Sequence, residues 1–221
     1  MALNFLHRAS LQPARIAIFP GAWNPPTVAH VAIAQASLQW ADEVIWILPK
    51  SFPHKSFDGA SFEQRQEMLR QLARTCDAFS AAVSETNLHI EMAREASVSC
   101  GPEVEIGVIC GRDAVERIAT WDYGRPGVFE EMLAAHPLLV ASRQGEYTAA
   151  SHLASRVIPL QLEADFNDVS SSEVRRRVEM KEAWQHLVPE TLVPEVARLY
   201  SAGVSAEPEQ RHKPLISSGN V

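Results

Sequence analysis

The sequence has few cysteines, a deficit of positive charge and no long apolar segment, and each absence excludes a class of protein. Its three cysteines, Cys76, Cys100 and Cys110, form no CxxC pair, so we expect neither a zinc site nor a disulfide framework, but reduced thiols of a cytoplasmic protein. The net charge of -7 argues against general binding to nucleic acid, which needs a basic surface. No apolar run approaches membrane-spanning length, and the first residues lack the apolar core of a signal peptide.

Apolar runs alternate with helical patterns along the chain. Such sequences form an α/β fold, here predicted as a Rossmann-like, doubly wound parallel sheet with a small C-terminal helical part. Ligands of such sheets bind beyond the carboxyl ends of the strands. We expect strands at residues 16–19, 43–48, 104–109, 137–141 and 156–162. Helices are expected at 28–40, 62–74, 171–180 and 194–200, and a further helix follows Gly111-Arg112-Asp113 and runs through Ile118. The less regular segment 76–101 is expected to hold a strand and then a helix at 88–96.

The chain is long enough for one sizeable α/β domain or for two small ones. We expect a single domain over residues 1–202, with its C-terminal helices starting near residue 171. From residue 203 onward the sequence is rich in Ser, Glu, Pro and Lys without an apolar period, which predicts a disordered tail.

Residues 21–30, with the sequence GAWNPPTVAH, lie between the first predicted strand and the first predicted helix. Backbone N–H groups and the helix dipole favour an anion at such a turn, and Gly21 permits its close approach. Thr27 and His30 lie three residues apart and share a helical face. A histidine there can stabilise charge during phosphoryl or nucleotidyl transfer. Alternatively, Thr27 only caps the helix and His30 packs in the core.

A second polar motif, VSSSEVR, occupies residues 169–175. Ser170 and Glu173 have the spacing of a capping box, which leaves Ser171, Ser172 and Arg175 unexplained. Ser172 and Arg175 should share a face at the helix start, where a hydroxyl, free N–H groups and a guanidinium suit phosphate oxygens. At least one of the three consecutive arginines, 175–177, is expected to be only a surface charge.

Taken together, the two motifs resemble those of the nucleotidyltransferase superfamily with a (His/Thr)-x-x-His signature, and within it the nicotinate/nicotinamide mononucleotide adenylyltransferases. Residues 21–30 are similar to G-G-x-F-[DN]-P-x-H-x-x-H with one glycine lost or moved, and residues 169–175 to I-S-S-[ST]-x-I-R. The resemblance covers most of residues 15–200. Further similar pieces follow in the family's order: Pro53-His54-Lys55, Gln64-Arg65 to Met68, Gly111-Arg112-Asp113, Trp121, Arg143-Gln144-Gly145 and Leu187-Val188-Pro189.

The resemblance implies that a mononucleotide phosphate attacks the α-phosphorus of ATP and releases pyrophosphate, with Mg²⁺ on the phosphates and no covalent enzyme intermediate. It implies small nucleotides as partners, with no nucleic acid, no membrane and a possible homo-oligomer. The catalytic residues implied are His30, Thr27, Arg175 and Lys55. The nucleotide-binding residues implied are Gly21, Ala22, Gly111, Asp113, Trp121, Arg143, Ser171 and Ser172, and no residue is expected to bind a metal.

Several of these residues carry defined roles in the resemblance. Gly21 and Ala22 would present backbone N–H groups to phosphate, while Ser171, Ser172 and Arg175 would hold the β- and γ-phosphates. Asp113 would accept from the ribose hydroxyls, and Trp121 would stack on the pyridine ring. The alternatives are an exposed loop lysine at Lys55, a charge at a helix N-terminus for Asp113 and a structural tryptophan at Trp121.

Three departures from the pattern keep other functions open. Thr27 at the first histidine position is typical of pantetheine-phosphate adenylyltransferases and glycerol-phosphate cytidylyltransferases, so a sister transferase with another acceptor or base is an alternative. Ala22 replaces a glycine, and residues 84–90 do not match the Y-T-x-D-T-L segment of bacterial nicotinate enzymes. A catalytically weak nucleotide-binding protein of the same fold is a third possibility. The first strand is not followed by G-x-G-x-x-G, which argues against a dehydrogenase of that type.

Overall fold

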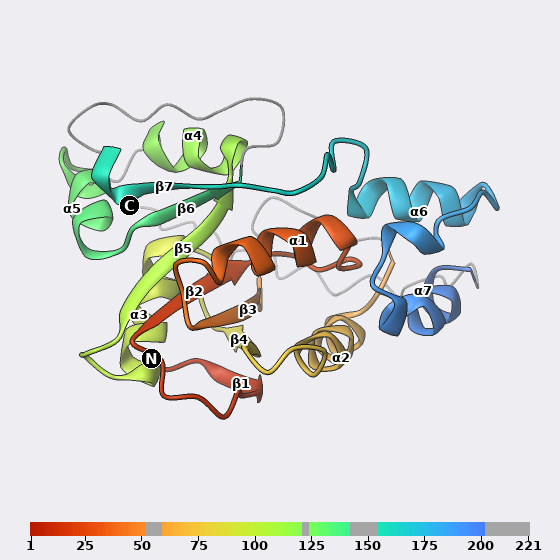
Figure 1. The fold of residues 1–221 in the computed structure, drawn as a ribbon, viewed down its shortest axis with the longest axis horizontal. Coiled ribbons are helices and arrows are strands. Elements are labelled where there is room, and N and C mark those ends of the chain that lie inside the picture. Colours follow the sequence, from red (N-terminus) through yellow and green to blue (C-terminus); the bar gives the residue numbers. More distant parts are fainter. Residues whose placement is uncertain (52–58, 121–123, 142–153, 202–221) are drawn as a thin grey trace, which may run out of the picture.

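A seven-stranded sheet forms the centre of the computed structural model, which describes residues 1–51, 59–120, 124–141 and 154–201 (Figure 1). Apolar runs build the central strands, and every residue of β3 is buried. The strands are β1 (Asn4–His7), β2 (Arg15–Pro20), β3 (Glu43–Pro49), β4 (Phe79–Ser84), β5 (Glu105–Gly111), β6 (Leu138–Ala141) and β7 (Val157–Leu160).

The strand order is β1-β4-β3-β2-β5-β6-β7, and all neighbours are parallel except β1 and β4. From β2 the chain first runs outward through β3 and β4, and it then returns to the other side of β2 with β5. This reversal confirms the predicted Rossmann-like, doubly wound sheet. In such sheets, ligands bind outside the carboxyl ends of the strands at the point where the strand order reverses, which here lies between β2 and β5.

Helices cover both faces of the sheet, because successive strand side chains point to opposite faces. Ile16 and Ile18 of β2 pack in one buried cluster with α3, α4 and α5, while Ala17 and Phe19 pack in another with α1 and α2. The helices of the sheet layers are α1 (Val28–Ser37), α2 (Phe62–Ala73), α3 (His89–Cys100), α4 (Arg112–Thr120) and α5 (Val128–Ala135).

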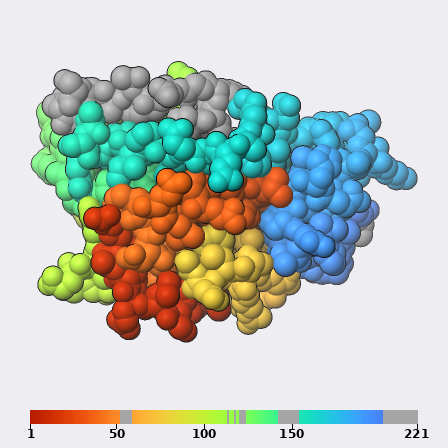
Figure 2. Space-filling view, in the orientation of Figure 1, coloured from red at the N-terminus to blue at the C-terminus, as the bar shows by residue number. Residues whose placement is uncertain are grey.

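The C-terminal part forms a third buried cluster, which includes Met68 of α2. Figure 2 shows this part, in blue, as one block at the end of the molecule beside α1 and α2. The block therefore lies next to the loop that follows β2. It consists of α6 (Ser171–Glu179), the short 3-10 turns η2 (Gln185–Leu187) and η3 (Glu190–Leu192), and α7 (Val193–Tyr200), and a further 3-10 turn, η1 (Ala154–Arg156), precedes β7.

The structure adds two elements that the sequence patterns did not indicate. β1 is an antiparallel edge strand on β4, and its four residues are too few to show an alternating pattern. α5 begins after Gly127, which has a left-handed φ of 81° and offers no capping side chain. The predicted helix at 28–40 ends at Ser37, and the irregular segment is a regular strand, β4, followed by α3. The predicted tail at 203–221 lies outside the described residues.

All three cysteines have free thiols. None of the helices in the described ranges combines the length and the apolar character that a membrane span requires. Over the same ranges, no three His, Cys, Asp or Glu side chains gather into a metal-binding group.

Candidate active site

The turn after β2 is built around the close approach of Trp23 to Gly21. A Cβ atom at Gly21 would lie 2.7–2.9 Å from three atoms of the Trp23 indole, so only glycine fits beneath the ring. Trp23 has a φ of 54°, and its Nε1 donates to the carbonyl of Ile47 at 2.8 Å. The Gly21 N–H donates to the same carbonyl at 3.0 Å. The predicted role of this N–H as a phosphate donor is therefore corrected: Gly21 anchors the turn to β3.

Aromatic side chains surround Trp23 and fix the ring of His30 beside it. The Trp23 ring lies 5.0 Å from Phe19, 4.9 Å from Trp46 and 5.2 Å from His30, measured between ring centroids. Trp23 is only 3% exposed. His30 therefore stands at the wall of a rigid aromatic cluster.

Thr27 and His30 form a reciprocal cap at the start of α1. The Thr27 backbone N–H donates to His30 Nδ1 at 3.0 Å, and Thr27 Oγ1 accepts from the His30 N–H at 3.4 Å. Thr27 Oγ1 also lies 2.8 Å from Nδ1. Thr27 is fully buried. Thr27 is thus the N-cap of α1, as the alternative interpretation expected, and its three-residue spacing from His30 brings the two side chains into contact.

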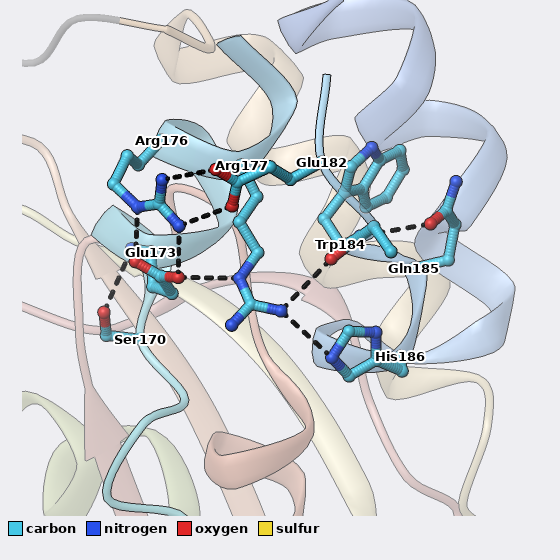
Figure 3. Close-up of polar contacts among 9 residues, drawn as sticks. Ser170, Glu173, Arg176, Arg177, Glu182, Trp184, Gln185 and His186 are labelled. Carbon is cyan, nitrogen blue, oxygen red and sulfur yellow. Dashed lines mark hydrogen bonds and ion pairs between the residues drawn. The ribbon is translucent and has the colours of Figure 1, made fainter. Parts of the chain in front are cut away.

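The three consecutive arginines of α6, 175–177, bond different partners. The Ser170 hydroxyl accepts from the Glu173 N–H at 3.1 Å, but the Glu173 carboxylate binds Arg176 and Arg177 instead of completing a capping box. Arg176 also pairs with Glu182, as Figure 3 shows. The hydrogen bonds from the two arginines lower the pKa of Glu173 to about 2. These two arginines are thus surface charges neutralised by acids.

Arg175, unlike Arg176 and Arg177, bonds the loop after β2 and so joins α6 to that loop. Its Nη1 donates to the carbonyl of Asn24 at 2.6 Å, and its Nη2 donates to Ser172 Oγ at 3.3 Å. The Ser171 hydroxyl donates to the carbonyl of Pro25 at 2.7 Å. The two motifs, about 150 residues apart, therefore meet, and Ser172 shares a face with Arg175 as predicted.

A cavity of about 400 Å³ lies where the motifs meet, at the carboxyl end of β2. Among the described residues that line it, Arg175 supplies a guanidinium and none is a carboxylate. Among the described residues, no group accepts from the backbone N–H groups of Ala22, Ser171 or Ser172. Free N–H groups at a helix start, together with a guanidinium, define an anion site. The cavity is lined by Phe19, Pro20, Gly21, Ala22, Trp23, Asn24, His30, Ser171, Ser172 and Arg175.

Two side chains that the sequence analysis did not assign to the site support this loop from outside the cavity. Arg65 of α2 is 6% exposed, and its Nη1 donates to the carbonyl of Ala22 at 3.3 Å. The Tyr200 hydroxyl donates to Asn24 Oδ1 at 2.5 Å, and the Ala60 N–H donates to the same oxygen at 3.3 Å. Arg65 belonged to a motif that resembles the family's R-x-x-M, whereas no sequence signal marked Tyr200.

Of the other predicted nucleotide-binding residues, the structure describes Gly111 and the backbone of Asp113. Gly111 ends β5 and Asp113 belongs to α4, so both are near the carboxyl ends of the strands, but the side chain of Asp113 is not described. Lys55, Trp121 and Arg143 lie outside the described residues, as does the Pro53-His54-Lys55 motif.

Comparison with known families agrees with this anion site at the end of β2. The family description Cytidylyltransferase-like matches residues 18–177, a range that begins in β2 and ends in α6. The chain therefore belongs to the cytidylyltransferase-like family.

The curated relatives of this chain are named as one kind of transferase. Each carries the name "Probable nicotinate-nucleotide adenylyltransferase". The relative from Geobacter metallireducens is 32% identical over 209 residues, which cover 80% of this chain and 92% of the relative. Those from Anaeromyxobacter dehalogenans and Carboxydothermus hydrogenoformans are 30% and 28% identical, again over 80% of this chain, and 91% and 92% of the relatives are covered.

Solved structures share the fold. The nicotinic acid mononucleotide adenylyltransferase of Plasmodium falciparum complexed with APC has a TM-score of 0.61 at 16% identity, over 83% of this chain and 94% of that one. The same enzyme complexed with NaAD has a TM-score of 0.59 at 17% identity, over 83% and 95% of the two chains.

Proposed function

We propose that this protein transfers AMP from ATP to nicotinate mononucleotide, or to its nicotinamide counterpart, as a step of NAD biosynthesis. The names of the relatives support this activity. The observation that carries it is the cavity that His30 and Arg175 both line, with no carboxylate among its described lining residues. Such a site suits a triphosphate, because opposing charge and N–H donors replace its hydration.

In the proposed reaction, an oxygen of the mononucleotide phosphate forms a bond to the α-phosphorus of ATP. The bond from that phosphorus to the bridging oxygen of the β-phosphate breaks, and pyrophosphate leaves with the electron pair. Arg175 and the N–H groups of Ser171 and Ser172 would hold the β- and γ-phosphates. His30 would donate to the α-phosphate, where charge develops. Catalysis is then positioning and charge stabilisation, without a covalent intermediate.

The remaining predicted residues keep their proposed roles. Lys55 would add a cation to the phosphate cluster, and Asp113 would accept from the ribose hydroxyls of adenosine. Trp121 would stack on the pyridine ring. Gly111 and Arg143 would complete the nucleotide site.

Mg²⁺ fits this site as part of the substrate. The described residues form no cluster of three metal ligands, and the cavity lining lacks a carboxylate. Phosphate oxygens are ligands that Mg²⁺ prefers, and the ion keeps several waters. We therefore propose that the ion enters with ATP, where it supplies charge neutralisation on the phosphates. A cytoplasmic setting is part of the same proposal and agrees with the three free thiols.

Thr27 favours one alternative, a sister transferase that acts on another phosphorylated acceptor or uses CTP. The family description itself names cytidylyl transfer. The two proposals differ only in the base and the acceptor, because both use the same triphosphate site.

The experiment that separates them is a pyrophosphate-release assay with Mg²⁺. ATP and CTP are each combined with nicotinate mononucleotide, nicotinamide mononucleotide, phosphopantetheine and glycerol phosphate. We expect turnover with ATP and a pyridine mononucleotide, and a loss of about 100- to 1000-fold in kcat for His30→Ala. Turnover only with CTP or a non-pyridine acceptor would support the sister activity, and no turnover with any pair would refute a transferase.

A further inference from the structure

The Thr27–His30 cap determines which nitrogen of the His30 ring carries a proton. The backbone N–H of Thr27 donates to Nδ1 at 3.0 Å. A backbone N–H has no lone pair, so Nδ1 must accept this bond and cannot itself be protonated. The ring proton of neutral His30 is therefore on Nε2.

The threonine hydroxyl completes the same arrangement. Thr27 Oγ1 accepts from the His30 N–H at 3.4 Å and lies 2.8 Å from Nδ1. Its own proton then points to Nδ1 as a second donor. With Nδ1 protonated instead, two hydrogens would face each other between Nδ1 and the Thr27 nitrogen. The backbone N–H of Thr27 therefore selects the tautomer, and the Thr27 hydroxyl, which can donate or accept, is compatible with it.

Burial separates Thr27 from any bound nucleotide. Thr27 is 0% exposed and is not among the residues that line the cavity, whereas His30 is one of them. The ring of His30 is also held edge-on by Trp23, at an interplanar angle of 80°. A ligand in the cavity would therefore meet His30 and not the threonine hydroxyl.

We propose that Thr27 is a positioning residue that holds His30 as the Nε2–H tautomer, oriented to donate to a phosphate oxygen, and that it does not bind phosphate itself. The kinetic part of this proposal rests on the proposed transferase activity, and the tautomer part does not. Neutral Nε2–H is a hydrogen-bond donor without a net charge, so the tautomer sets the direction of donation. Loss of the Thr27 hydroxyl should lower kcat more than it changes the KM for ATP, since Arg175 and the α6 N–H groups stay in place.

The direct test is the ¹⁵N NMR spectrum of histidine-labelled protein without nucleotide, at a pH where His30 is neutral. The His30 signals are assigned by their disappearance in His30→Gln. We expect a pyridine-type Nδ1 and a pyrrole-type Nε2 in the wild type and in Thr27→Ser, which keeps the hydroxyl. A pyrrole-type Nδ1 in the wild type would overturn the proposal whether or not the protein turns over any substrate.

The kinetic test compares Thr27→Val with Thr27→Ser. Thr27→Val keeps the branched shape and the backbone N–H but removes the hydroxyl. We expect its kcat to fall about 10- to 100-fold, because a small displacement of a catalytic group is enough for such a loss. The KM for ATP should change less than threefold, roughly within the range expected when the phosphate-binding groups stay in place. Thr27→Ser should keep most of kcat.

Two kinetic results would contradict the proposal. A folded Thr27→Val with wild-type kcat would show that the hydroxyl positions nothing. A rise in KM equal to the loss in kcat/KM would assign Thr27 to phosphate binding instead. Where Thr27→Val does not fold, the wild-type NMR spectrum and the kinetics of Thr27→Ser decide, since loss of kcat in Thr27→Ser together with a mixed tautomer would refute the assignment.

Discussion

Replacing Gly21 by alanine tests whether the loop after β2 is held rigid by Trp23. The new Cβ would lie 2.7–2.9 Å from the indole. The ring has little room to move, because its Nε1 is bonded to Ile47 and the ring makes T-shaped contacts with Phe19 and Trp46. Overpacking of this kind costs about 1–3 kcal/mol. The backbone at Gly21 has no left-handed φ, so alanine also gains about 0.4–1 kcal/mol by restricting the unfolded chain.

The net expectation is that Gly21→Ala lowers the free energy of unfolding by about 1–2 kcal/mol, which lowers Tm by about 2–8 °C for a chain of this size. Urea denaturation followed by circular dichroism measures the first quantity and a thermal scan the second. Gly111→Ala is the matched control for stability: its Cβ would meet nothing within 4 Å, so the entropy gain should remain and the variant should be slightly more stable. Equal stability of the two variants would refute the close approach of Trp23.

Three further variants test other contacts of the site. Arg175→Lys removes the guanidinium that bonds both Asn24 and Ser172, so the KM for ATP in the pyrophosphate assay should rise about tenfold or more. An unchanged KM would show that Arg175 does not bind the triphosphate. Tyr200→Phe removes the hydrogen bond to Asn24 Oδ1 and should lower the free energy of unfolding, measured in urea, by about 0.5–1.5 kcal/mol. Wild-type stability of this variant would mean that the hydrogen bond contributes nothing. The pKa of Glu173 is lowered from 4.5 to about 2 by its arginines, so its stabilising contribution is complete above pH 4.5 and is lost as pH falls toward 2. The stability difference between wild type and Glu173→Gln should therefore shrink between pH 6 and pH 3.5, and a difference that grows would contradict the ion pairs.

The central sheet could be predicted because its strands are continuous apolar runs. Residues 16–19 and 43–48 became β2 and β3, which are buried on both faces and need no polar alternation. β1 was not predicted, because the formation of a short edge strand depends on pairing with its neighbour β4. β4 itself is rich in small residues. Pairing across the sheet is a tertiary effect that a local pattern does not contain.

The two site motifs were predictable for a similar reason: each has a local spacing with a physical meaning. Thr27 and His30 touch because residues three apart share a helical face, and Ser172 and Arg175 follow the same rule. The hydrogen-bond partners of the site residues could not be predicted from the sequence. The Gly21 N–H pairs with Ile47, which depends on how β2 and β3 align, and Tyr200 reaches Asn24 across 176 residues. Such contacts arise only once the whole chain is folded.

The hydrogen bond between Tyr200 and Asn24 joins two residues that are synthesised at different times. During synthesis, the loop that carries Asn24 is made 176 residues before its partner on α7. At about 5–20 residues per second, this separation corresponds to about 10–35 s. Arg175, which also bonds Asn24, is made 151 residues after it, so for most of that interval the nascent chain contains His30 but not Arg175. A chain that stops before α6 therefore has the loop after β2 but lacks the guanidinium that completes the proposed anion site.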